Sequence, residues 1–130
     1  MIAAAALVIS WVAPDLVRAQ EAQFSPRIDD GRIAYDKYCT PCHGPGGAPG
    51  SAVFPDSKQP IDLRTYVQRH GGNFPWDSWF AVVLGVPVNS AHRPVWKRIR
   101  TDQSATAEGE VVAHGIVATI ADYVISIQAH

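Results

Sequence analysis

The sequence predicts a helical protein, because every regular segment that it indicates is a helix. The clearest one is near the C-terminus, where apolar residues recur at steps of three and four, the spacing of one helix face. These residues are Val112, Ile116, Ile120, Tyr123, Val124 and Ile127. The sequence has no β-hairpin signal and no strand-rich segment. A length of 130 residues leaves room for one folded domain.

The N-terminus is predicted to be a signal peptide for export, over residues 1–19. An apolar run over residues 1–13 is too short to span a bilayer but suits the apolar part of such a signal. Val17-Arg18-Ala19 then places small residues where a signal peptidase cuts, although the usual basic start is missing. Retention of the run as an uncleaved membrane anchor is the alternative. Residues 20–28 are expected to form a flexible arm, and residues 29–130 the domain.

The first helix of the domain is predicted to follow Asp29-Asp30, since the helix dipole favours negative charge at a helix start. Gly31, Tyr35 and Tyr38 then share one face of this helix. Gly115 lies inside the C-terminal helix, where a glycine costs about 1 kcal/mol relative to alanine. A close crossing of the two helices at Gly31 and Gly115 would account for that cost.

The middle of the chain combines irregular segments with two short helices. Residues 44–60 are dense in glycine and proline, and a loop of this length in a small domain usually has a function. Asp62 is predicted to cap a helix over residues 63–69, and a second helix is predicted over residues 76–84. The buried face of the second helix is expected to be Trp79, Phe80, Val83 and Leu84. Residues 86–96 are predicted to be irregular.

The most specific motif is Cys39-Thr40-Pro41-Cys42-His43, followed by Gly44. Cys-x-x-Cys-His is the attachment signature of a c-type haem, in which two thiols bond to the porphyrin and the histidine takes an axial position on iron. The two intervening residues allow one tight turn to present both sulfurs to one porphyrin edge. We therefore predict one covalently bound haem c, held by Cys39 and Cys42, with His43 as the proximal iron ligand.

Other uses of two cysteines fit less well. A structural zinc site needs four ligands, and the chain has 2 cysteines. A thioredoxin-like redox motif belongs near a βαβ pattern, which the sequence does not indicate. A structural disulfide in an exported, haem-free binding domain stays open as a third interpretation.

Over about residues 29–128 the chain resembles the small monohaem class I cytochromes c. The resemblance is carried by Gly31-x-x-x-Tyr35-x-x-x-Cys39-x-x-Cys42-His43-Gly44, by Pro94-Val95-Trp96 and by Asp122-Tyr123-Val124 in the last helix. Residues 62–75 and 125–128 are similar to a bacterial subgroup of exported electron carriers. The resemblance implies an all-α, class I cytochrome c-like fold. In that fold the N- and C-terminal helices cross, and short helices and loops surround one c-type haem.

The chain departs from this family at the distal iron ligand. The family usually places a methionine just before the Pro-aromatic segment, but the one methionine here is Met1, inside the predicted signal. The aligned position is Arg93, which has no lone pair for a metal, and its neighbour is His92, an ordinary haem ligand. We therefore expect His92 as the distal ligand and a lowered potential. Alternatively, His92 is a surface residue and the sixth position is open or otherwise filled.

Three further side-chain predictions concern the surroundings of the haem. His70 is a competing donor, and His114 is expected to face solvent. The carbonyl of Pro49 or Pro55 is expected to accept the other ring proton of His43, which would fix the axial imidazole. A basic cluster beside Trp96 would steer partners or be a solvated face, and consists of Lys97, Arg98 and Arg100.

These features predict an electron carrier rather than an enzyme. With 11 basic and 12 acidic residues, no broad attraction to nucleic acid or to an anionic membrane is expected. We expect a periplasmic carrier, or the electron-transfer subunit of an oxidoreductase, which meets redox partner proteins and has no stable membrane span after signal cleavage. The alternative is a haem protein that binds or transforms nitric oxide, carbon monoxide or peroxide at an open distal site.

Overall fold

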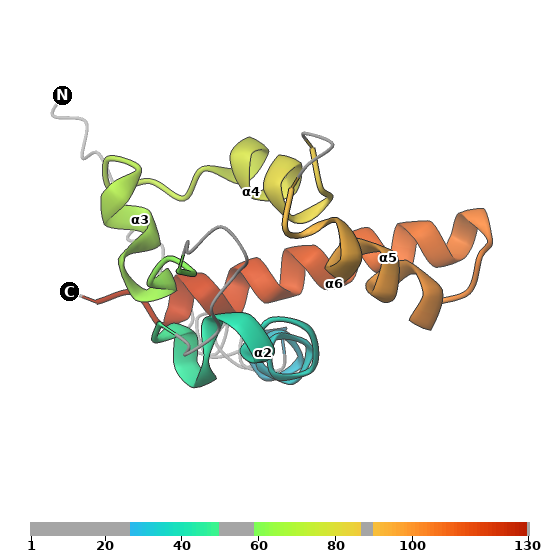
Figure 1. Cartoon of the computed structure of the whole chain (residues 1–130), viewed down its shortest axis with the longest axis horizontal. Coiled ribbons are helices and arrows are strands. Elements are labelled where there is room, and N and C mark those ends of the chain that lie inside the picture. The colour runs from blue at the N-terminus through green and yellow to red at the C-terminus, as the bar shows by residue number, and fades with distance from the viewer. Residues whose placement is uncertain (1–26, 50–58, 87–89, 130) are drawn as a thin grey trace, which may run out of the picture.

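The computed structural model describes residues 27–49, 59–86 and 90–129, and all regular elements in these ranges are helices. The all-α class is therefore confirmed for this part of the chain (Figure 1). The predicted signal peptide and most of the predicted arm lie outside the described residues. In chain order the elements are a helix over residues 27–38, α2 (Thr40–His43), the 3-10 turns η1 (Pro45–Gly47) and η2 (Leu63–Thr65), α3 (Tyr66–Arg69), α4 (Trp76–Val83), α5 (Arg93–Asp102) and α6 (Ala107–Ser126).

The long helix α6 is the axis of the fold, and the other helices pack around it (Figure 1). It begins where the side chain of Thr106 accepts a hydrogen bond from the Gly109 amide, an N-cap that satisfies one free donor of the first turn. By length and composition α6 alone among the described helices could cross a membrane. Its buried residues form the centre of the core, and they are Ala113, Val117, Ile120, Ala121, Tyr123 and Val124.

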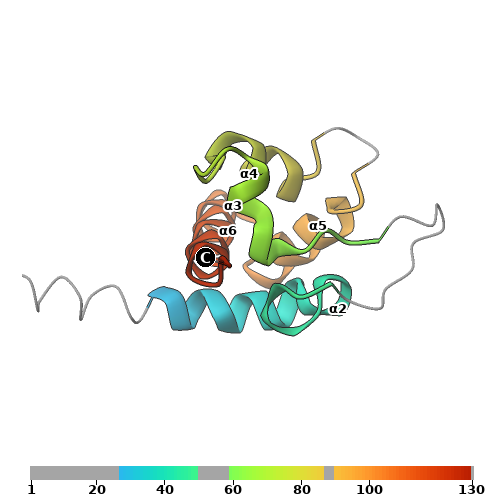
Figure 2. The same cartoon turned by 90° about the vertical axis from the view of Figure 1, so that its left-hand side faces the viewer.

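The helix over residues 27–38 crosses α6 at Gly31 (Figure 2). A Cβ at Gly31 would overlap the carbonyl oxygen of Thr119 and lie 3.0 Å from the Cβ of Tyr123. The predicted close approach at Gly31 is thus present, but its predicted partner is wrong. A Cβ at Gly115 would meet nothing within 4 Å, because that glycine lies on an exposed part of α6.

The face shared by Gly31, Tyr35 and Tyr38 is buried, as predicted. The helix also extends through residues 27 and 28, which the sequence placed in the arm. The guanidinium of Arg27 forms an ion pair of 2.7 Å with Asp122 on α6. The folded part therefore starts before residue 29, and Asp29 and Asp30 lie inside the helix instead of preceding it.

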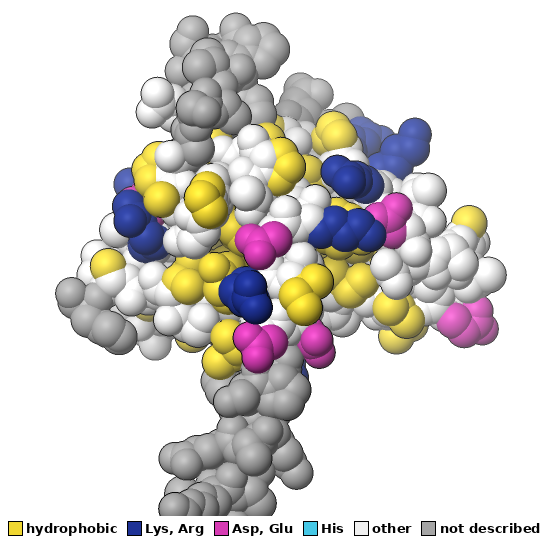
Figure 3. Space-filling view, turned by 90° about the horizontal axis from the view of Figure 1, so that it is seen from below, with side chains coloured by type: hydrophobic (Ala, Val, Ile, Leu, Met, Phe, Trp, Pro, Cys, Tyr) yellow, Lys and Arg dark blue, Asp and Glu magenta, His cyan; other side chains and the backbone are white. Residues whose placement is uncertain are grey.

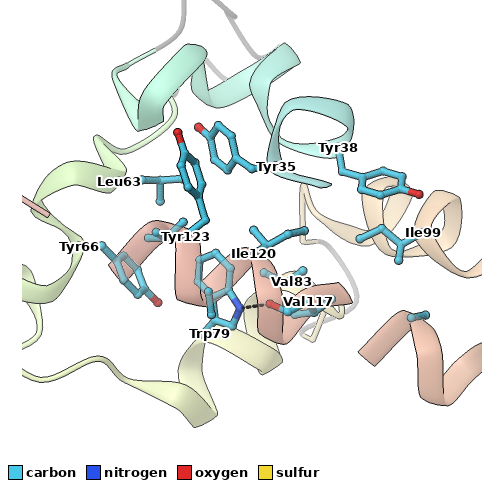
Figure 4. Packing of buried hydrophobic residues seen from close by; sticks show 13 residues of the cluster. Tyr35, Tyr38, Leu63, Tyr66, Trp79, Val83, Ile99, Val117, Ile120 and Tyr123 are labelled. Atoms are coloured by element: carbon cyan, nitrogen blue, oxygen red, sulfur yellow. Dashed lines mark hydrogen bonds between the residues drawn. The ribbon is translucent and has the colours of Figure 1, made fainter. Parts of the chain in front are cut away.

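The two short central helices agree with their predictions. Asp62 accepts a hydrogen bond of 2.9 Å from the Arg64 amide at the start of η2, as a cap should. On α4, Trp79 and Val83 are buried, whereas Phe80 and Leu84 are partly buried. Figure 4 shows the Trp79 ring beneath α6, where its indole N–H donates to the Val117 carbonyl over 3.1 Å.

The segment before residue 97 differs from its prediction. Residues 93–96 were expected to be irregular, but they form the first turn of α5. A proline is well tolerated there, since a first-turn amide has no partner inside the helix and the fixed φ angle of proline is already helical. No helix was predicted over residues 93–102, and the start of α5 at Arg93 places His92 at the N-cap position.

Candidate functional site

A cavity of about 780 Å³ lies between α2, η2, α4, α5 and α6. Its wall includes Cys39, Cys42, His43 and His92, so the structure brings together all four predicted site residues. The rest of the wall is mostly apolar and includes Leu63, Tyr66, Trp79, Val83, Val95 and Ile120. Cofactor sites commonly have volumes of about 300–1,000 Å³, apolar linings and few polar groups.

The cysteines reach the cavity through a tight turn at the end of the first helix. The helix is interrupted at Cys39, and the Cys39 carbonyl accepts amide hydrogen bonds from Cys42 at 3.1 Å and His43 at 2.9 Å. The hydroxyl of buried Tyr35 donates to the carbonyl of Gly44 over 2.9 Å and so fixes the end of this turn. Both thiols and the His43 ring therefore contribute to one wall.

His43 is oriented by a backbone hydrogen bond. Its Nδ1 lies 3.3 Å from the carbonyl oxygen of Ile61, and because a carbonyl only accepts, Nδ1 is the donor. The other ring nitrogen, Nε2, then has a free lone pair for a metal. The predicted acceptor, a carbonyl of Pro49 or Pro55, was wrong, although Pro55 itself lies outside the described residues. The chain returns at Ile61, which is 18 residues from His43.

His92 faces His43 inside the cavity. The centroids of the two imidazole rings are 5.9 Å apart, and their planes differ by 17°. This separation is too large for stacked rings in contact. Two metal–nitrogen bonds of about 2 Å each, plus the half-widths of two rings, span a similar distance. The pair is thus spaced as two ligands on opposite sides of one metal ion.

Burial sets the charge state of the two imidazoles and of the Cys39 thiol. Removal from water lowers the pKa of His43, and a hydrogen bond to Ile61 offsets part of this effect. Burial and then the positive charge of His43 lower the pKa of His92. Both imidazoles are therefore neutral at pH 7, which is the form that binds metals. Burial and the neighbouring Cys42 raise the pKa of the Cys39 thiol to about 12.

The Cys39 thiol is consequently expected to react slowly with alkylating agents in haem-free protein. Thiolate is the reactive form, and a pKa of about 12 instead of 9.0 reduces its fraction at pH 8 by roughly 1,000-fold. Iodoacetamide labelling followed by peptide mass mapping measures this rate. The same chain in denaturant is the control, and equal labelling of Cys39 in both states would contradict the described burial.

The other predicted donors do not reach the cavity. His70 Nδ1 lies 2.8 Å from the carbonyl of Tyr66, and the His70 ring packs against the Tyr66 ring with the centroids 4.4 Å apart. His114 is partly buried instead of facing solvent, with its ring 4.9 Å from that of Trp96 in an edge-on contact. Neither histidine lines the cavity, so His92 is the one that the fold places opposite His43.

The predicted basic cluster points away from the cavity. Trp96, Lys97 and Arg100 line a second hollow on the other side of α5, and Arg98 lies over the ring of Tyr38 at 5.8 Å. Arg100 also pairs with Glu110 over 3.1 Å. The cluster is therefore not part of the cavity wall.

The mouth of the cavity is mostly apolar, and the exposed side chain of Gln59 is a polar member of its lining. Ile61 and Val82 line the cavity, and each is 41% exposed to solvent. Sequence reasoning missed both residues. Ile61 is an isolated apolar residue after a loop, and Val82 lies on α4 outside the face that was predicted to be buried. The hydrophobic periodicity of α4 did point to its neighbours Trp79 and Val83.

Comparison with family models, curated proteins and solved structures finds no match for this chain. The site therefore has to be assessed by its own chemistry. Within the described ranges no group of three or more His, Cys, Asp or Glu side chains is placed to hold a metal ion. Two imidazoles on opposite sides instead suit an iron whose other four ligands come from a porphyrin, and the apolar walls and two thiols suit the porphyrin itself.

Proposed function

We propose that this protein is an exported monohaem c-type cytochrome that transfers electrons, with a class I cytochrome c-like fold. Cys39 and Cys42 attach one haem c, His43 is the proximal iron ligand and His92 is the distal one. The observation that supports this most strongly is the pair of imidazoles 5.9 Å apart in a cavity whose wall carries both thiols of the Cys-x-x-Cys-His motif.

Bound haem would supply reversible one-electron chemistry, and the chain would tune it. The Ile61 carbonyl holds the His43 ring and increases its basicity through the Nδ1 hydrogen bond. The apolar residues around the cavity exclude water. Since methionine ligation raises the potential of cytochromes c, two imidazoles imply a midpoint potential below that of His/Met relatives.

As a carrier, the protein needs redox partner proteins but no catalytic base or substrate pocket. We infer that it acts in the periplasm after removal of residues 1–19, either alone or as the electron-transfer subunit of an oxidoreductase. Figure 3 shows Lys and Arg side chains interspersed with Asp and Glu on one face of the molecule. The mixture agrees with a formal net charge of −1 and does not favour nucleic acid as a partner.

The test is the intact mass and absorption spectrum of protein co-expressed with a c-type maturation system. We expect the mass of one covalent haem and a low-spin spectrum in both redox states. The reduced protein should resist carbon monoxide, because both axial positions are filled. The double variant Cys39→Ser/Cys42→Ser is the matched control without the adduct. Wild-type protein without a haem adduct would reject the proposal and favour a haem-free domain.

A small-ligand haem protein is the second candidate function. It is favoured by the His92 ring, which has no hydrogen bond to the described part of the chain, whereas His43 has one to Ile61. A distal imidazole that leaves the iron would admit nitric oxide, carbon monoxide or peroxide. An immediate Soret shift when carbon monoxide is added to the reduced protein would favour this function over simple electron transfer.

A further inference from the structure

We propose that Gly85 and Ser90 are positioning residues for the distal imidazole, because they clamp the start of α5 against the end of α4. This inference rests on the proposed function, since it assigns His92 to the iron. The clamp lies in a part of the chain outside the Cys-x-x-Cys-His motif. Its rigidity determines how readily the distal position opens to an exogenous ligand.

Gly85 forms the first part of the clamp. It follows α4 with a φ angle of +80°. The space that a Cβ of residue 85 would fill is occupied by the backbone of Arg93, the residue after His92. A Cβ at position 85 would lie 2.9 Å from the Cα of Arg93 and 3.3 Å from its amide nitrogen. Backbone atoms cannot move aside as a flexible side chain can, so any larger residue would push the first turn of α5 away from α4.

Ser90 forms the second part of the clamp, through two hydrogen bonds. Its hydroxyl donates to the carbonyl of Val82 on α4 over 3.3 Å, and its oxygen accepts the amide N–H of His92 over 3.2 Å. The Ser90 carbonyl also accepts the amide of Arg93 over 3.1 Å. One side chain therefore connects the last turn of α4 with the backbone of the distal ligand.

The orientation of the His92 ring depends mainly on the position of its backbone, whereas the orientation of the His43 ring is also fixed by a side-chain hydrogen bond. His43 has a ring hydrogen bond to Ile61, but the described residues offer no hydrogen-bond partner to the His92 ring. The orientation of His92 toward His43 is thus set by the position of the first turn of α5. When that turn moves, the distal imidazole moves with it.

Gly85→Ala tests the first part of the clamp, with Gly71→Ala as the matched control. Both glycines have positive φ angles, +80° and +73°, but a Cβ at Gly71 would meet nothing within 4 Å. Both variants therefore place an alanine in a strained backbone conformation, but only Gly85→Ala also creates a clash with Arg93. The measurement is the rate of carbon monoxide binding to the reduced, haem-loaded full chain, followed at the Soret band.

We expect Gly85→Ala to bind carbon monoxide roughly tenfold faster than Gly71→Ala, a factor equivalent to about 1.4 kcal/mol. Ser90→Ala removes two hydrogen bonds and should increase the rate by roughly five- to hundredfold, at about 0.5–1.5 kcal/mol for each bond. Ser90→Thr should restore the wild-type rate because the hydroxyl is kept. Ser90→Ala also decides the question if Gly85→Ala does not fold. Equal rates in Gly71→Ala and in the variants of Gly85 and Ser90 would overturn the inference.

Hydrogen exchange separates this inference from the proposed function. In haem-free full-length chains, amides over residues 90–97 should exchange faster in Gly85→Ala than in Gly71→Ala, because the first turn of α5 is loosened. This comparison does not require iron. A wild-type protein without covalent haem would reject the proposed function, whereas equal exchange over residues 90–97 would reject the clamp.

Discussion

Replacing His92 by alanine is expected to open one axial position of the haem, so that the reduced protein binds carbon monoxide at once. Under the proposed ligation, the imidazole of His92 competes for the same position in the wild type. If it occupies that position 99% of the time, its removal raises the apparent affinity for carbon monoxide about 100-fold. The measurement is a carbon monoxide titration of the reduced protein, together with ferric and ferrous spectra.

His70→Ala is the matched control for this experiment. His70 is also a histidine at the end of a helix, but its ring nitrogen lies against the Tyr66 carbonyl and does not reach the cavity. His70→Ala should therefore keep the wild-type bands and the resistance to carbon monoxide. If His92→Ala kept them as well, His92 would not be a ligand of the iron.

Replacing Gly31 by alanine is expected to destabilise the folded chain by more than about 3 kcal/mol, at the upper end of the range for overpacked sites. The added methyl group would overlap the carbonyl oxygen of Thr119, which cannot move without breaking the hydrogen bonding of α6. Urea denaturation of the variant and the wild type gives the difference in the free energy of unfolding.

Gly115→Ala should have the opposite sign. The methyl group would meet nothing within 4 Å, and alanine is favoured over glycine in an exposed helix by about 0.5–1 kcal/mol. The two variants make the same chemical change in two helices of one protein, at a buried position in Gly31→Ala and at an exposed position in Gly115→Ala. Equal stability changes in both would contradict the described crossing at Gly31.

Local patterns were sufficient to predict most of the helices and the tight turn of the Cys-x-x-Cys-His motif. The Asp62 cap and most of the α6 stripe depend on residues that are close in sequence, so spacing reveals them. Val112 was wrongly included in the stripe, since it is 50% exposed, and the small residues Ala113 and Ala121 of the buried face were missed. His92 was chosen because arginine at the aligned position has no lone pair for a metal, and the structure places its ring in the same cavity as His43. Its role as an iron ligand stays a prediction.

Features that depend on chain packing could not be predicted. The carbonyl that orients His43 comes from Ile61, and every residue has a carbonyl, so the sequence carries no signal for it. The two helical glycines look alike in sequence, and only their three-dimensional neighbours tell Gly31 from Gly115. The whole of α5 was missed, since no helix was predicted over residues 93–102, although a proline such as Pro94 is well suited to the first turn of a helix.

The apolar mouth formed by Ile61 and Val82 has a consequence for encounters with other proteins. A porphyrin in the cavity would meet the outside at uncharged side chains, while the cationic side chains Lys97 and Arg100 lie across α5. Electron transfer would then take place where two apolar surfaces pack together and exclude water. Shape complementarity, more than charge, would determine which partner binds there. Ionic strength would change how often two molecules meet but have little effect on transfer once they have docked.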